Sequence, residues 1–198
     1  MLDVADRTAF ENYAQEVASH FGSVHLVINN AGVALNARID EMTVEELEWQ
    51  MSINFWGVAY GTLFFLPYLK QAEEAHIVNI SSIFGIVGFP GVGAYNASKF
   101  AVKAINEGIA LDLLGTRIRV TSIDPGLVET EFSEVRFHGD KARAETVYEG
   151  YDPLTGEDIA DIVSYVVNTP DHVNILDLIV LPTAQRSAHM VHKEPAPK

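Results

Sequence analysis

The feature that most constrains the fold of this 198-residue chain is an alternation of short apolar runs with segments of helical periodicity. The apolar runs are rich in branched residues, which is typical of strands buried on both faces of a sheet. They lie at residues 24–29, 76–81, 118–123 and 176–182. The helical segments are expected at 7–21, 43–69, 95–114 and 155–167. This order predicts an α/β fold with right-handed crossovers, a mostly parallel sheet and helices on both of its faces.

Local signals mark where these helices begin and end. Asp6 precedes the first helix and Gly22 can end it in a left-handed turn. Thr43 with Glu46 has the spacing of a capping box, so the second helix should begin there. Gly115 is expected to close the third helix, and Thr155 should cap the fourth.

Length and charge narrow the class of protein. A chain of 198 residues suits one domain, and its formal net charge of −14 without a basic stripe argues against nucleic acid as a partner. The absence of cysteine excludes disulfides and thiolate metal sites and fits a reducing compartment. The third residue is already charged, so we expect no signal peptide and a cytoplasmic protein.

The stretch Trp49–Leu69 carries no charged residue over 21 positions, which is long enough to span a bilayer. Polar side chains, two glycines and Pro67 dilute it, so we expect no membrane span. A helix that is apolar nearly all round can instead be buried between a sheet and a neighbouring subunit. A homodimer or homotetramer is therefore expected.

Residues capable of chemistry follow the predicted strands. NNAG (29–32), NISS (79–82) and DPGLVET (124–130) each stand at the end of a strand. Parallel sheets bind their ligands at the carboxyl ends of the strands, so these segments should meet at one site.

Tyr95 and Lys99 are spaced i and i+4, so they share one face of a helix. A close ammonium should move the pKa of the phenol from about 10 toward neutrality, where a proton shuttle operates. Ser82 stands 13 residues before Tyr95, and the glycine-rich segment between them can fold back to bring the two hydroxyls together. Asn54 lies in the uncharged helix, where a buried amide needs partners. Each signal is weak alone, and their spacing is the stronger observation.

Together these motifs resemble the short-chain dehydrogenase/reductase family from Asp3 onward. The resemblance implies a Rossmann-like, doubly wound parallel sheet forming a single domain over residues 1–198. It implies that Tyr95 is the general acid/base and that Ser82 hydrogen-bonds the substrate oxygen. Lys99 would lower the tyrosine pKa and hold the nicotinamide ribose, while Asn54 would support a water that relays protons to Lys99.

The resemblance also implies a nicotinamide cofactor, NADP by the branch that the chain is most similar to, with NAD possible. Asp3 and Val4 would contact the adenine. The other implied cofactor-binding residues are Asn30, Ala31, Gly32, Tyr95, Lys99, Pro125, Gly126, Val128 and Thr130.

One departure from the family concerns its glycine-rich, pyrophosphate-binding turn after the first strand. The chain has no counterpart, and we expect it to lack the family's first two strand–helix units at its N-terminus. The glycines of 85–93 lie between Ser82 and Tyr95, so they more plausibly shape the substrate loop.

Residues 131–163 and the closing segment resemble NADP-dependent 3-hydroxy acid, or serine and allo-threonine, dehydrogenases. We expect 131–155 to be a substrate-loop region and 183–198 a C-terminal tail. Arg136, Lys141 and Arg143 can attract a substrate carboxylate or be solvated surface charges, and the sequence assigns none of them.

The leading hypothesis is therefore an oxidoreductase acting on a small hydroxy acid or alcohol. One alternative is a catalytically silent, truncated subunit that contributes only to assembly. Another is a sugar-nucleotide epimerase of the related extended family, which the DPGLVET segment disfavours. No metal is expected, because His189 and His192 lie near the end of the chain without a nearby third ligand.

Overall fold

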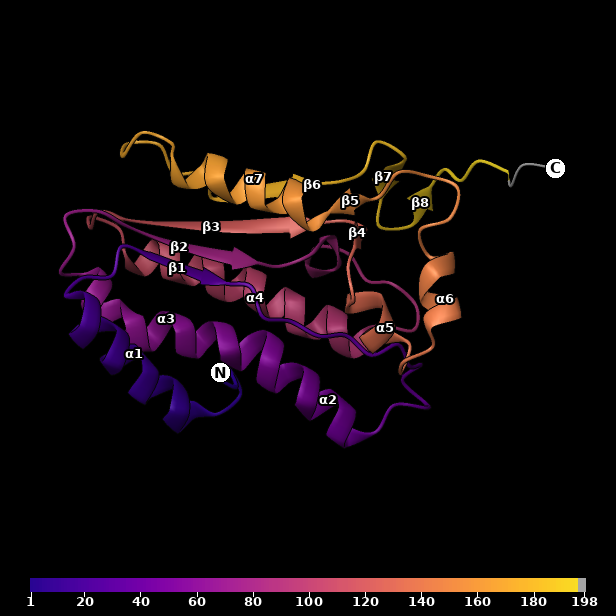
Figure 1. Cartoon of the computed structure of the whole chain (residues 1–198), viewed down its shortest axis with the longest axis horizontal. Coiled ribbons are helices and arrows are strands. Elements are labelled where there is room, and N and C mark those ends of the chain that lie inside the picture. The colour runs from indigo at the N-terminus through magenta and orange to yellow at the C-terminus, as the bar shows by residue number, and fades with distance from the viewer. Residues whose placement is uncertain (196–198) are drawn as a thin grey trace.

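The computed structural model describes residues 1–195 and is built on a four-stranded parallel sheet in the order β1-β2-β3-β6 (Figure 1). The strands are β1 (Leu26–Asn29), β2 (Ala75–Ile80), β3 (Ile118–Pro125) and β6 (Asp177–Val180). Their register sets Val27 beside Ile77, and Ile77 beside Val120. The predicted α/β, Rossmann-like fold is confirmed.

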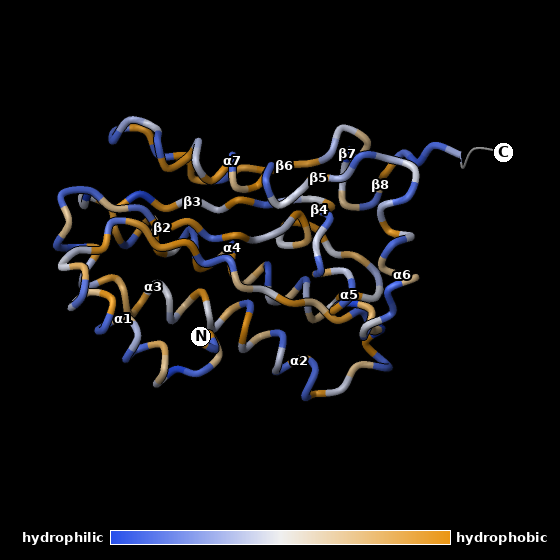
Figure 2. The backbone as a smooth tube through the Cα atoms, in the orientation of Figure 1, coloured by the Kyte–Doolittle hydropathy of each residue, from blue (hydrophilic) through white to orange (hydrophobic). Residues whose placement is uncertain are grey.

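Helices cover both faces of this sheet. On one face lie α1 (Arg7–Phe21), α2 (Val44–Met51), α3 (Gly57–Leu69) and α4 (Gly93–Asp112), and on the other lies α7 (Gly156–Val167) (Figure 1). Phe10, Phe65 and Ile77 belong to the core of the first face. Val78 and Val166 belong to the core of the second. Apolar segments accordingly run along the central strands and along parts of the helices beside them (Figure 2).

The crossovers do not share one hand. The chain steps from β1 to β2 to β3 to β6 in one direction, through α3 and α4 on one face and then α7 on the opposite face. A parallel crossover on the opposite face, with the same direction of step, has the opposite hand. The expectation of uniformly right-handed crossovers is therefore wrong. The long excursion between β3 and α7 explains how the chain can reach the other face.

Local capping is as predicted for α1, α2 and α7, whereas α4 ends at Asp112 with Leu113 as its C-cap, so Gly115 lies beyond the end of that helix. Asp6 caps α1 by accepting a hydrogen bond from the amide of Ala9, and Gly22 ends that helix with φ of 77°. Thr43 and Thr155 both open helices with complete capping boxes. The predicted helix at 43–69 contains an interruption, because the segment Ser52–Trp56 forms a π-helical turn between α2 and α3.

The edge strand β1 departs from the prediction. Its side chains alternate between buried and exposed, with Leu26 38% and Ile28 44% exposed. The reason is that one face of β1 lacks a cover: Val27 packs in the cluster on the α1–α4 face, whereas the apolar cluster beneath α7 includes residues of β2, β3 and β6 but none of β1. Burial on both faces was the wrong expectation for this strand.

Smaller elements gather at the carboxyl ends of the strands (Figure 1). They are the 3₁₀ turn Ile83–Gly85, β4 (Val128–Glu129), α5 (Phe132–Arg136), α6 (Lys141–Thr146), β5 (Leu154–Thr155), β7 (Gln185–Ser187) and β8 (Met190–Val191). The segment predicted as a C-terminal tail contains secondary structure, because β7 and β8 form a hairpin within it. In the described part of the chain, no helix combines the length and apolarity needed to cross a membrane.

Candidate active site

A pocket of about 710 Å³ opens where β1, β2 and β3 end, with α5 and α7 contributing to its walls. It brings together most of the residues singled out from the sequence. Those that line it are Asn30, Gly32, Ser82, Tyr95, Lys99, Pro125, Gly126, Val128 and Thr130. Asn54 is fully buried, and Asp3, Val4 and Ala31 do not line this cavity.

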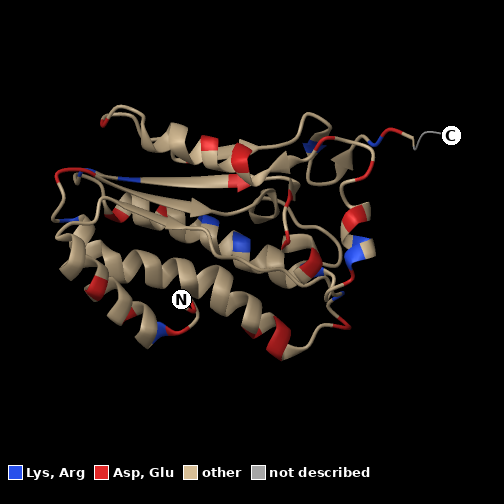
Figure 3. Ribbon diagram, viewed as in Figure 1, with Lys and Arg blue, Asp and Glu red and all other residues tan. Residues whose placement is uncertain are grey.

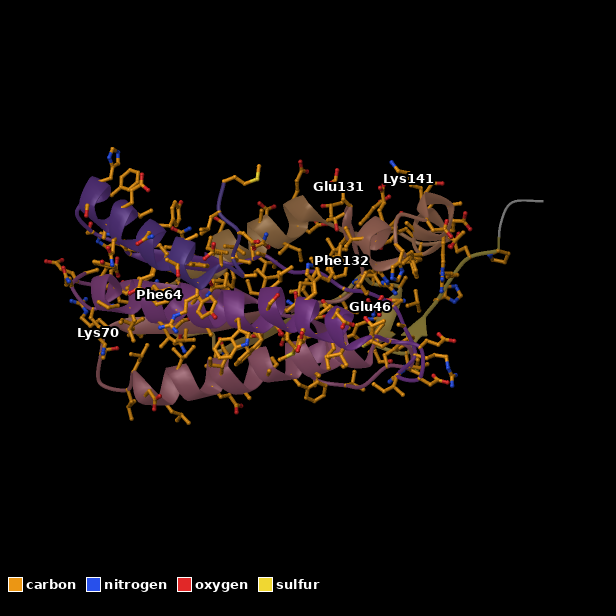
Figure 4. All side chains as sticks on the ribbon, turned by 90° about the horizontal axis from the view of Figure 1, so that it is seen from below. Glu46, Phe64, Lys70, Glu131, Phe132 and Lys141 are labelled. Atoms are coloured by element: carbon orange, nitrogen blue, oxygen red, sulfur yellow. The ribbon has the colours of Figure 1, made fainter. Side chains whose placement is uncertain are left out.

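Tyr95 lies in the first turn of α4 and is only 7% exposed. Its ring makes edge contacts with Phe84, 6.2 Å between centroids, and with Phe132, at 5.8 Å. In Figure 4, Phe132 lies well inside the outline of the molecule, whereas the neighbouring Glu131 lies near its edge. Burial among these groups raises the pKa of Tyr95 to about 12, and only partly offsetting effects come from the Ser82 hydroxyl and the Arg136 charge. The expected fall of this pKa toward neutrality is therefore wrong for the structure.

The contacts of Lys99 show why the i, i+4 spacing does not by itself lower the pKa of Tyr95. Its ammonium donates to the carbonyl of Ile80 at 2.9 Å and lies 5.8 Å from the centroid of the Tyr95 ring. Burial lowers the pKa of Lys99 to about 8, and the carboxylate of Asp124 opposes this effect. The bond to Ile80 is the only one that its ammonium makes with residues 1–195, so further N–H groups remain for a ligand.

Ser82 caps the 3₁₀ turn Ile83–Gly85, and its Oγ accepts a hydrogen bond from the amide of Phe84 at 3.2 Å. The segment that follows is fastened to α4 by a residue that the sequence reasoning missed, Asn96. Its Nδ2 donates to the carbonyls of Phe84 and Val87 at 2.7 and 2.9 Å, and its Oδ1 accepts from the amide of Phe89. The predicted fold-back of the glycine-rich segment is thus confirmed, and Asn96 holds it. A polar residue next to Tyr95 in the first turn of a buried helix was the available signal.

Asn54 occupies the π-helical turn, a geometry often found at functional sites. Its Oδ1 accepts from the amide of Val33, while its Nδ2 donates to the carbonyl of Val33 and to Ser98 Oγ, all within 2.8–2.9 Å. A Cβ placed on Gly32 would lie 3.5 Å from both Asn54 Oδ1 and Lys99 Nζ, so these groups adjoin one another. The amide therefore positions the loop after β1 beside Lys99.

Two further residues hold the loop that follows β3. Gln185, from β7, accepts a hydrogen bond from the amide of Leu127 at 2.9 Å, and its side chain leaves no room for a Cβ at Gly126. The hydroxyl of Tyr148 donates to the carbonyl of Val128 at 2.8 Å and also bonds Ser133 Oγ. No local pattern indicates either contact, because the partners are distant along the chain.

Comparison with known proteins agrees with this geometry. Residues 1–141 match the family described as short chain dehydrogenase. The chain belongs to this family.

Its relatives within the short-chain dehydrogenases carry more specific names. It is 34% identical over 196 residues to an NADP-dependent 3-hydroxy acid dehydrogenase of Schizosaccharomyces pombe, covering 98% of this chain and 76% of that protein. It is 37% identical to the NADP-dependent 3-hydroxy acid dehydrogenase YdfG of Escherichia coli K12, covering 98% and 79%. A solved structure described as the closed form of serine dehydrogenase complexed with NADP⁺ matches with a TM-score of 0.91 at 37% identity, again covering 98% and 79%.

The remaining predicted site residues of this short-chain dehydrogenase lie elsewhere. Asp3 accepts a hydrogen bond from the amide of Ala5, and Val4 packs against Gly57 at the start of α3. Their contact with an adenine ring stays a prediction. His189 stacks on Phe89, with ring centroids 5.3 Å apart. Across residues 1–195 no three histidine, aspartate or glutamate side chains are grouped to hold a metal.

Proposed function

We propose that the protein is an NADP-dependent dehydrogenase that reversibly oxidises the hydroxyl of a small hydroxy acid, with NAD as a possible replacement for NADP. The observation that carries this proposal is the convergence of Ser82, Tyr95 and Lys99 on one pocket. The relatives named as NADP-dependent 3-hydroxy acid dehydrogenases support the cofactor and the substrate class.

The residues present fit the nicotinamide end of such a cofactor. Lys99 has N–H groups left for ribose hydroxyls, and Asn30, Pro125, Gly126, Val128 and Thr130 form the adjoining wall. A nicotinamide cofactor held there would supply the acceptor for the hydride that leaves the carbinol carbon of the substrate.

Proton transfer falls to the chain itself. Ser82 would hold the substrate oxygen by a hydrogen bond, and the Tyr95 phenolate would take the hydroxyl proton as the carbonyl forms; in reduction Tyr95 returns it. Burial opposes the phenolate, so catalysis needs a positive charge to favour it. Lys99, 5.8 Å from the ring centroid, is a cation on the same helix and lines the same pocket. The role of Asn54 in a water relay to Lys99 belongs to the same proposal.

The test is Tyr95→Phe in the full chain, assayed by the ultraviolet absorbance of NADPH with a series of hydroxy acids and alcohols. Removal of one positioned acid/base should lower kcat by about 10²- to 10⁴-fold, while NADP binding by calorimetry changes little because the ring remains. Tyr165→Phe is the matched control, since Tyr165 is exposed on α7. Near-full kcat in Tyr95→Phe would remove this residue from the mechanism. A wild-type chain that binds NADP and turns over no substrate would favour the alternative of a silent subunit.

A further inference from the structure

Arg136, at the end of α5, lines the active-site pocket, and its guanidinium makes no hydrogen bond or ion pair with residues 1–195. Its Nε is buried and makes no hydrogen bond within residues 1–195, and no ion pair of this arginine occurs there either. Asn36 lines the same pocket, and its buried Oδ1 is likewise without a partner in that range. Buried polar groups are nearly always hydrogen-bonded, so this pair of open groups indicates a polar ligand.

The charge of the pocket indicates an anion. The charged side chains that line it are Lys99 and Arg136, and no aspartate or glutamate does so, although the whole chain has a net charge of −14. Acidic residues lie elsewhere, on α1, α2 and α7 among other elements (Figure 3). A cavity that excludes carboxylates in so acidic a protein is suited to bind one from a ligand.

The guanidinium is also held in place before any ligand binds. The backbone carbonyl of Arg136 accepts a hydrogen bond from the amide of Asn36 at 3.0 Å. The Cζ atom of Arg136 lies 4.8 Å from the centroid of the Phe137 ring, and the Cζ atom of Arg143 lies 4.4 Å from the same centroid. Because the structure already fixes this side chain, little freedom is lost when a ligand binds it.

We infer that Arg136 binds the carboxylate of the substrate and thereby selects hydroxy acids over neutral alcohols. This inference rests on the proposed function and adds the specificity-determining residue. A planar guanidinium can bind a carboxylate through two parallel hydrogen bonds. Arg136 lies near enough to Tyr95 for its charge to act on the phenol, so the carboxylate would lie close to the reacting hydroxyl, as in a short hydroxy acid.

The other two candidate cations are less suited to this role. Lys141 pairs with Glu134 at 3.5 Å, its side chain is 74% exposed, and it lies at the outer surface in Figure 4. Arg143 stacks on Phe137 but does not line the pocket. Arg143 therefore provides a matched control, because it shares the aromatic contact and lacks access to the cavity.

The experiment compares 3-hydroxybutanoate with its methyl ester, which keeps the reacting hydroxyl and lacks the anion. Binding is measured in the presence of NADP by ligand-observed NMR, and turnover by NADPH formation. In Arg136→Gln the affinity and kcat/KM for the acid should fall about 10- to 150-fold, the range for lost hydrogen bonds to a charged group. Values for the ester should change less than about 3-fold, and Arg143→Gln should leave both ligands unaffected. Thermal melts of each variant establish that it folds, and Arg136→Lys should recover part of the preference because it keeps the charge.

Equal losses for acid and ester in Arg136→Gln would overturn the inference, and so would an unchanged preference for the acid. A wild-type chain that binds the acid no better than the ester would overturn it as well. Turnover of neutral alcohols without turnover of any hydroxy acid would refute the proposed substrate class but not the dehydrogenase chemistry. The two failures are therefore distinguishable.

Discussion

Replacement of Lys99 by methionine should reveal a stability penalty that comes from burying the ammonium. Burial lowers the pKa of Lys99 from its ordinary 10.5 to about 8, so between these values the unfolded chain binds more protons than the folded one. The free energy of unfolding must then rise with pH in that window. Below pH 8 the penalty is fully present, and it is relieved as the pH approaches 10.5.

The size of the effect follows from the two pKa values. One pKa unit corresponds to about 1.4 kcal/mol, so the wild-type penalty is about 3 kcal/mol at pH 7 and about 1 kcal/mol at pH 10. Methionine has a similar length and no charge. The stability of wild type minus that of Lys99→Met should therefore increase by roughly 2 kcal/mol from pH 7 to pH 10. The lost hydrogen bond to the Ile80 carbonyl shifts this difference at all pH values by a similar amount, so it does not alter the slope.

Urea unfolding followed by circular dichroism at several pH values measures this difference directly. Lys141→Met serves as the control, because it removes an ammonium that is exposed to solvent rather than buried. Tyr95 has a pKa of about 12 in the folded protein and about 10 in the unfolded chain, and because wild type and Lys99→Met both contain it, its contribution cancels in the difference. A wild-type minus Lys99→Met difference that is flat, or that falls with pH, would refute the assignment of Lys99 as a desolvated ammonium.

Two further predictions concern packing. Gly61→Ala should destabilise the chain by about 1 to 3 kcal/mol, because the new Cβ would meet the buried Asn29 side chain, which donates to Asn79 at 2.8 Å. Gly108→Ala, with open space at its Cβ inside α4, should raise the thermal midpoint instead, and equal effects at the two sites would contradict this account. The uncharged stretch Trp49–Leu69 should pack against a sister subunit, and a stable monomer in light scattering at micromolar concentration would exclude that interface.

Elements with local causes were predictable from the sequence. The caps at Asp6, Thr43 and Thr155 depend on residues three positions apart, and the structure forms all three. The β7–β8 hairpin was not predicted. It is joined to the rest of the protein by contacts such as that of Gln185 with the amide of Leu127, 58 positions away. A pattern within a short window does not contain that information.

The candidate site shows the same division. The segments at the strand ends predicted which residues surround the pocket, because a parallel sheet aligns its carboxyl ends. The pKa values of Tyr95 and Lys99 were not predictable, because the spacing of these two residues along the chain contains no information about their burial. Desolvation raises the pKa of the phenol and lowers that of the ammonium, so it disfavours the charged form of each.

Because burial already raises the pKa of the Tyr95 phenol, the proposed binding of the substrate carboxylate by Arg136 has a second consequence. A carboxylate bound beside Tyr95 is a like charge to the phenolate and would by itself raise the phenol pKa further. Arg136 lies near enough to lower the phenol pKa, so if it pairs with that carboxylate the two charges beside the phenol are together close to neutral. Arg136→Gln removes this positive charge with either ligand bound, so the pH at which kcat is half-maximal should move upward for both the acid and the methyl ester. Unchanged profiles with both ligands would show that the charge of Arg136 does not act on the phenol.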